Sequence, residues 1–296
     1  MSATNPYPQF LLLGDSLIQY SSRLHPQNDT EGKPVALANG RTFSFGAALA
    51  ERTERCVDVV NRGFSGYNTS NILRILERLI PVPEVARVEV LLLLLGANDA
   101  CLPTSSTNQH IPLTEYRQNL KKIITHPAIQ KQNPKILLVT PPPVHEAHLE
   151  AEDLRKGNGA LTREQKVTRE YAQVVRDVAE ELDGEGREVV LVDLWRDVMD
   201  DVRAKTEPRS ESESNSESKI EGGGDKEALL GELSQGPNKR FYELLVDGLH
   251  MSGEGYRIFF DAVIKALGGK WGEGGVDSEA WVFPKWDDAP RMEEGS

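Results

Sequence analysis

Five short apolar segments, each followed by turn residues and then by a longer amphipathic segment, constrain the fold more than any other feature of the sequence. They are Phe10–Leu13, Val57–Val60, Val88–Leu95, Ile136–Val139 and Val189–Val192. Apart from Asp58 and Glu89, the residues of these segments are apolar without regular alternation, which is typical of strands buried on both faces of a parallel sheet. The pattern therefore predicts five parallel strands.

The segments between these strands predict the connecting helices, at Phe45–Arg55, Thr69–Leu79, Leu113–Thr125 and Thr162–Leu182. In the last of them, apolar residues recur every three or four positions, which is the spacing of one helical face. Strands that alternate with helices form βαβ units. We therefore expect an α/β fold, a three-layer α/β/α sandwich around a central five-stranded parallel sheet. In the flavodoxin-like strand order 2-1-3-4-5, the first three strands are neighbours.

The chain of 296 residues is long enough for one large α/β domain, and we expect a single domain over residues 1–296. Residues 206–235 are rich in Ser and Glu and predict a disordered insert within it. A tail begins at about residue 268. We expect its aromatic residues, Trp281, Phe283 and Trp286, to hold the tail against the body.

Charge and composition exclude several classes of partner. The net charge of −12 and the pI near 5.1 argue against nucleic acid or an anionic membrane. No stretch reaches the ~20 apolar residues that span a bilayer, and the first residues do not resemble a signal peptide. Two cysteines, Cys56 and Cys101, make no disulfide framework. We expect a cytoplasmic protein with no nucleic-acid partner and no stable membrane insertion.

Small and polar residues follow the first three predicted strands. Gly14-Asp15-Ser16 follows the first, a segment with Gly63 and Gly66 follows the second, and Gly96 to Asp99 follows the third. Ligands of open α/β sheets bind at the carboxyl ends of the strands. We therefore expect Ser16, these glycines and Asn98 to converge on one crevice.

Ser16 is suited to be a nucleophile. It lies where a strand turns into a helix, and the N–H groups of a helix N-terminus favour negative charge. Its own N–H, a glycine N–H and the Asn98 amide are suitable donors to an oxyanion. A glycine suits this place because it has no side chain to obstruct the approaching carbonyl oxygen.

A base for this nucleophile stands near the other end of the chain. In the segment DGLH, Asp247 and His250 are three residues apart. In a tight turn this spacing allows the carboxylate to bind the imidazole, hold its tautomer and stabilise the imidazolium. Ser16, Asp247 and His250 together make a complete catalytic triad.

The four segments together resemble the four sequence blocks of the SGNH (GDSL) hydrolase family. They are GDSL with Ser16, FSG with Gly66, GAND with Asn98, and DGLH with Asp247 and His250. The resemblance covers residues 8 to 267, apart from the acidic insert. Within the family, NRGFSGYNTS, LLGANDACLP and DGLHMSGEGY resemble the isoamyl acetate-hydrolysing esterases.

This resemblance implies a three-layer fold, no metal or other cofactor, and ester hydrolysis through an acyl-enzyme. It assigns Ser16 as nucleophile, His250 as base and Asp247 as the residue that orients His250. The oxyanion hole would consist of the Ser16 N–H, the Gly66 N–H and the Asn98 amide. We expect a small-molecule ester as substrate, short-chain alkyl acetates first, and the family permits a homodimer.

Other functions stay open. A lysophospholipase, a thioesterase or a carbohydrate deacetylase would use the same residues. A flavodoxin-like ligand-binding module is the alternative without catalysis, although the sequence has neither a GxGxxG nor a Walker-type loop. A third alternative is an interaction protein that acts through the Ser/Glu-rich insert.

Several further residues lie beside the predicted site. Asp15 and Asp99 follow strands, where a helix-capping or loop-fixing role is expected. Phe64 and Tyr67 flank Gly66 and either line a substrate pocket or pack in the core. His145 begins the segment HEAH, which does not have the HExxH spacing of zinc proteases. We expect a solvated loop there, with substrate contact by His145 as the second interpretation.

Overall fold

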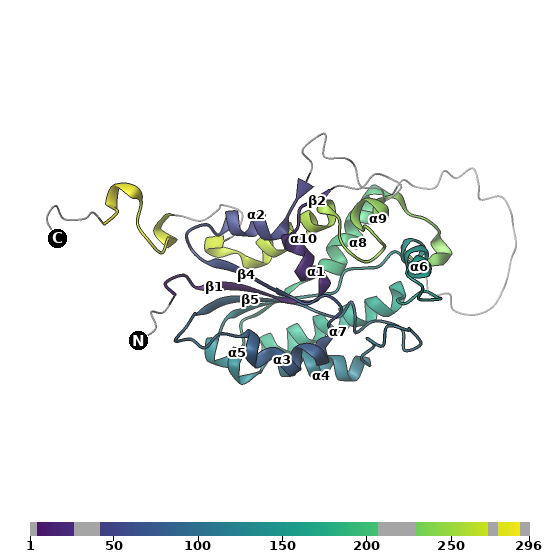
Figure 1. Cartoon of the computed structure of the whole chain (residues 1–296), viewed down its shortest axis with the longest axis horizontal. Helices are drawn as coiled ribbons and strands as arrows, with labels where there is room; N and C mark the ends of the chain where they lie inside the picture. The colour runs from purple at the N-terminus through teal and green to yellow at the C-terminus, as the bar shows by residue number, and fades with distance from the viewer. Residues whose placement is uncertain (1–4, 27–41, 207–228, 272–277, 291–296) are drawn as a thin grey trace, which may run out of the picture.

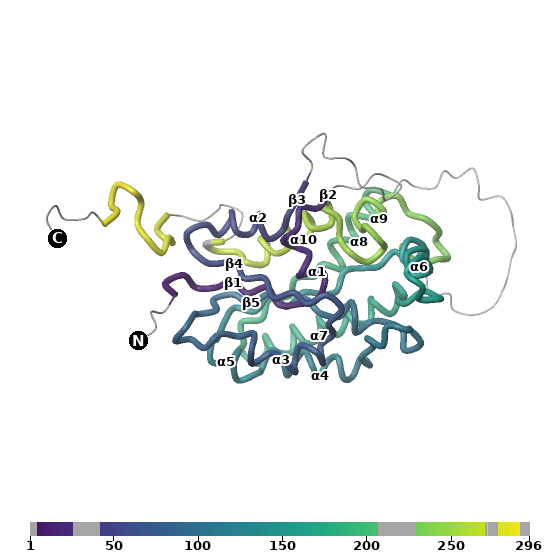
Figure 2. Tube along the Cα trace, in the orientation of Figure 1, coloured from purple at the N-terminus to yellow at the C-terminus, as the bar shows by residue number. Residues whose placement is uncertain are grey.

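The central sheet has the strand order predicted for a flavodoxin-like protein. The computed structural model describes residues 5–26, 42–206, 229–271 and 278–290. The five strands of the sheet are β1 (Gln9–Gly14), β4 (Asp58–Gly63), β5 (Val88–Leu94), β6 (Lys135–Val139) and β7 (Val189–Val192). Their spatial order is β4-β1-β5-β6-β7, every pair is parallel, and β1 lies between β4 and β5 (Figure 2). This is the order 2-1-3-4-5, and the fold prediction is confirmed.

Helices cover both faces of the sheet, so the fold has three layers (Figure 1). On one face lie α2 (Phe45–Arg52), α8 (Leu194–Lys205) and α10 (Gly253–Leu267). On the other lie α3 (Thr69–Leu79), α4 (Leu113–Ile124), α5 (Pro127–Gln132) and α7 (Gln165–Gly184). Phe10 and Leu12 of β1 pack into the first layer, whereas Leu11 and Leu13 pack into the second. A strand buried on both sides must be apolar at every position, which explains the continuous segments.

Some short helices have no clear pattern in the sequence. They are α1 (Ser16–Gln19), α6 (Glu146–Arg155) and α9 (Lys239–Leu244). In addition, β2 (His25–Pro26) and β3 (Thr42–Phe43) form a small antiparallel sheet. The segment at α6 was expected to be a loop, and this is wrong. Its buried side chains are Glu146, Leu149 and Asp153, so the inward face has no apolar periodicity to detect.

The end of the predicted insert belongs to the folded body. Residues 207–228 lie outside the described residues, but residues 229–235 do not. The Leu230 carbonyl accepts a hydrogen bond from Gln165 Nε2 at 3.1 Å, and the Gly231 carbonyl accepts one from the Glu146 N–H at 2.8 Å. The Glu146 carboxylate in turn accepts from the Leu233 N–H at 2.9 Å. These bonds attach the segment to α6 and to the start of α7.

Two of the three tail aromatics contact the body. Trp281 packs partly against the core and lies under the Arg55 guanidinium, 3.9 Å from the ring centre. Phe283 lies beside Tyr7, with ring centres 5.8 Å apart. Trp286 is 85% exposed, so the expectation that it holds the tail is wrong.

Among the described residues no helix is long and apolar enough to cross a bilayer. The cytoplasmic location and the homodimer stay predictions.

Candidate active site

Three loops meet at the carboxyl ends of β1, β4 and β5. Gly14, the last residue of β1, is in register with Gly63 of β4 and with Leu94 of β5. Just beyond this point, the Phe64 N–H donates to the Gly14 carbonyl at 2.9 Å. The residues that follow these strands therefore start at the same level of the sheet edge, as the sequence predicted.

Ser16 is the first residue of α1, immediately after the β1 turn. The Asp15 carboxylate caps this helix by accepting a hydrogen bond from the Leu17 N–H at 2.9 Å, and Ser16 is buried. A Cβ atom on Gly63 would lie 2.0 Å from the Gln19 backbone nitrogen. The glycine is therefore required for α1 to lie this close to β4, and this contact holds Ser16 at the sheet edge.

Ser16, His250 and Asp247 form one continuous chain of hydrogen bonds. His250 Nε2 lies 2.9 Å from Ser16 Oγ, although the two residues are 234 positions apart in the sequence. His250 Nδ1 lies 2.8 Å from Asp247 Oδ2. Asp247 Oδ1 accepts from the N–H groups of Leu249 and His250, at 3.1 and 2.8 Å. One carboxylate thus folds the turn and orients the imidazole within it.

The Asp247 carboxylate is held in its ionised form. Burial raises the pKa of this group, but the hydrogen bond and positive charge of His250 lower it by more, so that the pKa lies well below its ordinary value. Lys156, which follows the last residue of α6, adds a weaker stabilisation, because its Nζ lies 3.3 Å from Asp247 Oδ2. An ionised carboxylate in this place fixes the imidazole tautomer and stabilises the imidazolium.

Asn98 and Gly66 lie on adjacent loops that are joined by a hydrogen bond. Asn98 Nδ2 donates to the Tyr67 carbonyl at 2.8 Å, and since an amide nitrogen carries two hydrogens, one N–H is left for a ligand. Gly66 has a φ of +82°, a backbone conformation that favours glycine, and its carbonyl accepts from Gln109 Nε2 at 2.8 Å. The Gly66 N–H and the Asn98 amide are therefore on loops beside the one that carries Ser16.

Asp15 and Asp99 have the capping and loop-fixing roles that were predicted. Asp99 accepts from the Thr69 N–H at 3.0 Å and from the Thr69 hydroxyl at 2.5 Å, which fixes the start of α3 to the loop after β5. Burial raises the pKa of Asp15 to about 6 and that of Asp99 to about 7. Both carboxyls are fully buried.

The residues expected to touch substrate lie in different surroundings. Phe64 and Tyr67 stack with ring centres 5.2 Å apart, and Phe64 packs partly against the core. Tyr67 is 36% exposed and lines a hollow of about 370 Å³ together with Gly66 and Arg74. Their contact with a substrate stays a prediction.

His145 is buried, so the solvated loop expected there is wrong. None of its surface is exposed, and its ring stacks on Phe241 with centres 5.3 Å apart. Its Nε2 accepts from the Asn238 N–H at 3.2 Å. The side chain packs between α6 and α9, and in this position it presents no surface to a substrate.

Tyr20, Gln109 and Arg163 lie near the site, and none of them was identified from the sequence. Tyr20 packs on the His250 ring with centres 5.3 Å apart, and its hydroxyl lies 3.1 Å from Ser65 Oγ. Arg163 Nη2 donates to Asn98 Oδ1 at 2.9 Å and to Gln109 Oε1 at 3.3 Å. For Tyr20 and Gln109 the sequence carries no signal. For Arg163 a signal exists, because a cation is unfavourable at the start of a helix and therefore needs another partner.

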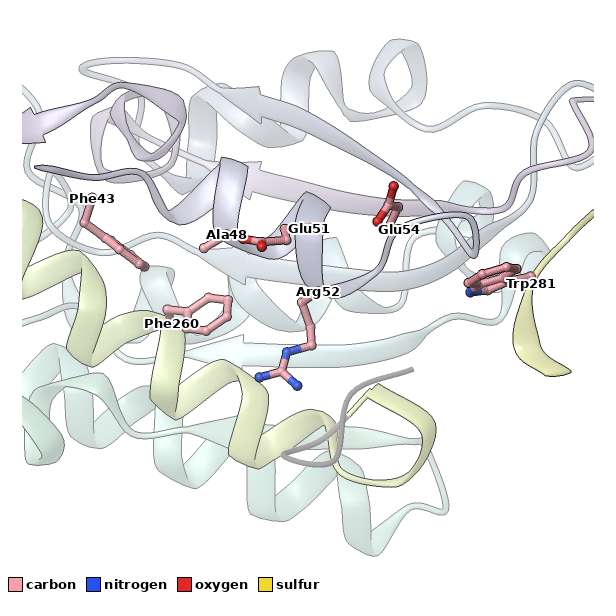
Figure 3. Close-up of a pocket in the computed structure, with 7 residues that line it drawn as sticks. All are labelled: Phe43, Ala48, Glu51, Arg52, Glu54, Phe260 and Trp281. Carbon is pink, nitrogen blue, oxygen red and sulfur yellow. The ribbon is translucent and has the colours of Figure 1, made fainter. Parts of the chain in front are cut away.

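A second hollow lies away from this site, on the side of α2 and α10. Its volume is about 530 Å³, and its lining residues come from β3, α2 and its end, α10 and the tail (Figure 3): Phe43, Ala48, Glu51, Arg52, Glu54, Phe260 and Trp281. None of them belongs to the Ser16 site.

Within the part of the chain that the structure describes, no three His, Cys, Asp or Glu side chains are grouped so that they could hold a metal ion.

Comparison with known sequences gives a consistent result. The family model described as GDSL-like Lipase/Acylhydrolase matches residues 10–263. The isoamyl acetate-hydrolyzing esterase 1 homolog of Mus musculus is 31% identical over 284 residues, which cover 95% of this chain and 88% of the mouse protein. A GDSL esterase/lipase of Arabidopsis thaliana is 33% identical over 231 residues, which cover 75% of this chain and 78% of the plant protein.

Solved structures show the same fold. The acetylxylan esterase Axe2 of Geobacillus stearothermophilus matches with a TM-score of 0.54 and 17% identity, over 90% of this chain and 96% of that one. The acetyl xylan esterase AlAXEase matches with a TM-score of 0.54 and 18% identity, over 88% and 99% of the two chains. At this low identity the similarity shows the fold alone.

Proposed function

This chain belongs to the GDSL-like lipase/acylhydrolase family and is a carboxylic ester hydrolase, and we propose that it hydrolyses small acyl esters through an acyl-enzyme. The observation that carries the proposal is the chain of hydrogen bonds from Ser16 Oγ to His250 and on to Asp247, at 2.9 and 2.8 Å. This arrangement activates a hydroxyl as a nucleophile at neutral pH.

In the proposed reaction, Ser16 Oγ attacks the ester carbonyl carbon while His250 Nε2 takes the hydroxyl proton. The negative charge that develops on the carbonyl oxygen is stabilised by the N–H groups of Ser16 and Gly66 and by the Asn98 amide. His250 then donates its proton to the leaving alcohol, and an acyl-enzyme remains. Water, activated by the same imidazole, releases the acid and restores the serine.

Short-chain alkyl acetates are the proposed substrates. The support comes from the mouse relative, whose name specifies isoamyl acetate and which aligns with 95% of this chain. Long-chain lipids, thioesters and acetylated carbohydrates are the alternatives, and they differ from alkyl acetates in acyl length, leaving atom or leaving group. The choice among them is therefore a measurement of substrate preference.

The test is the hydrolysis of p-nitrophenyl esters from acetate to dodecanoate. We expect activity that is highest on acetate and falls with chain length, and Ser16→Ala should lower kcat by about 10⁶-fold. Ser21→Ala is the matched control, because Ser21 is also buried and lies five residues further on, next to Asn61. It should keep the wild-type kcat.

Three outcomes would change the proposal. A preference for dodecanoate would move the substrate to lipids. Turnover in Ser16→Ala at the wild-type rate would remove Ser16 as the nucleophile. The absence of Ser16-dependent turnover of any ester, together with no reaction of Ser16 with a fluorophosphonate, would contradict the proposed catalysis altogether.

A further inference from the structure

A buried arginine, Arg163, is hydrogen-bonded to Asn98 and, through Gln109, to Gly66, which are two of the proposed oxyanion donors. Arg163 precedes α7, and only 6% of its surface is exposed. Its Nε donates to the Ala97 carbonyl at 2.6 Å, and its Nη1 donates to Thr162 Oγ1 at 3.0 Å. Its Nη2 is shared between two side-chain amides, with Asn98 Oδ1 at 2.9 Å and Gln109 Oε1 at 3.3 Å. All its hydrogen-bond partners are neutral oxygens.

The absence of an ion pair distinguishes Arg163 from another buried arginine. Arg240 is 8% exposed and pairs with three carboxylates, Asp201, Glu243 and Glu254. Among the described residues no carboxylate forms an ion pair with Arg163. Its guanidinium donates to the neutral oxygens named above. A buried charge without a counter-ion is unfavourable for folding, and such features persist where they serve a function.

The guanidinium determines which way the Asn98 amide faces. A guanidinium has only N–H donors and no acceptor, so only the oxygen of Asn98 can face Arg163. The Asn98 nitrogen must then point away from it, toward the Tyr67 carbonyl. Without Arg163, only the bond to the Tyr67 carbonyl would hold the amide in this orientation, and a rotated amide would present its oxygen, which would repel an oxyanion.

Arg163 also fixes the orientation of the Gln109 amide, which is bonded to Gly66. Because Gln109 Oε1 faces Arg163, the Gln109 Nε2 is turned to the Gly66 carbonyl, to which it donates at 2.8 Å. This bond holds Gly66 in its left-handed conformation, with a φ of +82°. The Gln109 backbone carbonyl also accepts from Asn68 Nδ2 at 3.0 Å, next to the same loop.

We propose that Arg163 is a positioning residue of this hydrolase, which aligns the Asn98 amide directly and the Gly66 N–H through Gln109. The inference rests on the proposed function, because it assumes that these two groups bind the oxyanion. Arg163 itself is behind these groups and does not touch the substrate. Its contribution is made when charge develops on the carbonyl oxygen, so it acts on kcat more than on KM.

The first experiment compares kcat and KM for p-nitrophenyl acetate. Arg163→Met should lower kcat by about 10²-fold with little change in KM, which is the range for a lost oxyanion donor. Arg176→Met is the matched control, because Arg176 of α7 is also largely buried and pairs with Asp193, with no bond to the proposed site. Its kcat should be unchanged. A rise in KM at constant kcat for Arg163→Met would overturn the proposal.

A double-mutant cycle tests whether Arg163 acts through Asn98. In an Asn98→Ala background the amide is already gone, so Arg163→Met should lower kcat by less than about tenfold. An equal fold-change in both backgrounds would overturn the inference. Arg163→Lys keeps the charge but has no planar fork of donors, and its kcat should stay below about one tenth of the wild-type value. Full activity in Arg163→Lys would also overturn it.

Gln109→Glu provides a test that does not depend on the folding of Arg163 variants. The glutamate keeps an oxygen for Arg163, but it has no N–H to donate to the Gly66 carbonyl. We expect a fall in kcat of about tenfold with unchanged KM, and thermal unfolding close to that of the wild type. A wild-type kcat in this variant would overturn the connection through Gln109.

The rate at which a fluorophosphonate labels Ser16 separates this inference from the proposed substrate. The phosphonyl oxygen requires the same oxyanion donors, so the cycle of Arg163 and Asn98 variants can be measured on labelling. If Ser16 is labelled but no ester is hydrolysed, the substrate proposal fails and the labelling cycle decides the role of Arg163. If Ser16 is neither labelled nor active, both proposals are overturned.

Discussion

The ionisation of Asp99 should make the stability of this protein fall as the pH rises. The Asp99 side chain is fully buried between the loop after β5 and α3, where both its oxygens accept from Thr69. Burial raises its pKa from 3.8 to about 7, and the hydrogen bonds from Thr69 offset only part of this effect. In the unfolded chain the group is solvated and keeps its ordinary pKa.

The sign and size of the effect follow from these two values. Below about pH 4 the carboxyl is protonated in both states, and its full contribution to stability is present. Between about pH 4 and 7 the folded protein keeps the proton that the unfolded chain has lost, so the free energy of unfolding falls as pH rises. A tenfold difference in proton affinity between the folded and unfolded states corresponds to about 1.4 kcal/mol, and a difference of about a thousandfold gives a loss on the order of 4 kcal/mol.

Asp99→Asn removes this titration and keeps an oxygen for the Thr69 hydrogen bonds. We expect the difference in unfolding free energy, wild type minus variant, to fall by up to about 4 kcal/mol between pH 4 and pH 8. Urea unfolding followed by tryptophan fluorescence at a series of pH values measures it. Asp15, with a pKa raised to about 6, titrates in both proteins, so only its repulsion of the Asp99 carboxylate, which also raises the Asp99 pKa, remains in the difference.

The control is Asp183→Asn, which removes an exposed carboxylate at the end of α7. This variant measures how the loss of one negative charge by itself changes the free energy of unfolding across the same pH series. A wild-type-minus-Asp99→Asn difference that stays constant from pH 4 to pH 8 would refute the reasoning. It would mean that Asp99 is ionised at low pH in the folded protein as it is in the unfolded chain.

Three further substitutions test the site and the core. Asp247→Asn should lower kcat on p-nitrophenyl acetate by about 10⁴-fold, because the amide no longer stabilises the imidazolium; a kcat within about tenfold of the wild type would contradict this role. Gly63→Ala should lower the free energy of unfolding by about 1–3 kcal/mol, because the new Cβ meets the Gln19 nitrogen at 2.0 Å; an unchanged urea midpoint would argue against that contact. Phe45→Ala should lower it by about 3–5 kcal/mol, because the ring is fully buried; a loss below about 1 kcal/mol in urea unfolding would contradict this packing.

The sheet and the place of the site upon it can be read from the sequence. Strands buried on both faces must be apolar at nearly every position, so the inner strands β1 and β6 are visible as continuous segments. The edge strand β4 has no buried residue, and only Val59 and Val60 mark it in the sequence. The turn residues that follow them are visible for the same reason, since Gly14, Asp15 and Ser16 interrupt the first apolar segment. The bond between Asp247 and His250 is also local, because three residues in one turn bring the two side chains together.

The contacts between distant polar residues arise only in the folded chain. Ser16 meets His250 across 234 positions, and Arg163 meets Asn98 across 65, and neither pair leaves a periodic pattern in the sequence. The same holds for α6, whose inward face includes the hydrogen-bonded carboxylates of Glu146 and Asp153. Apolar burial repeats with the period of the backbone, so it can be read along the chain. A buried polar group needs only one partner of matching chemistry, which any distant segment can supply once the fold has formed.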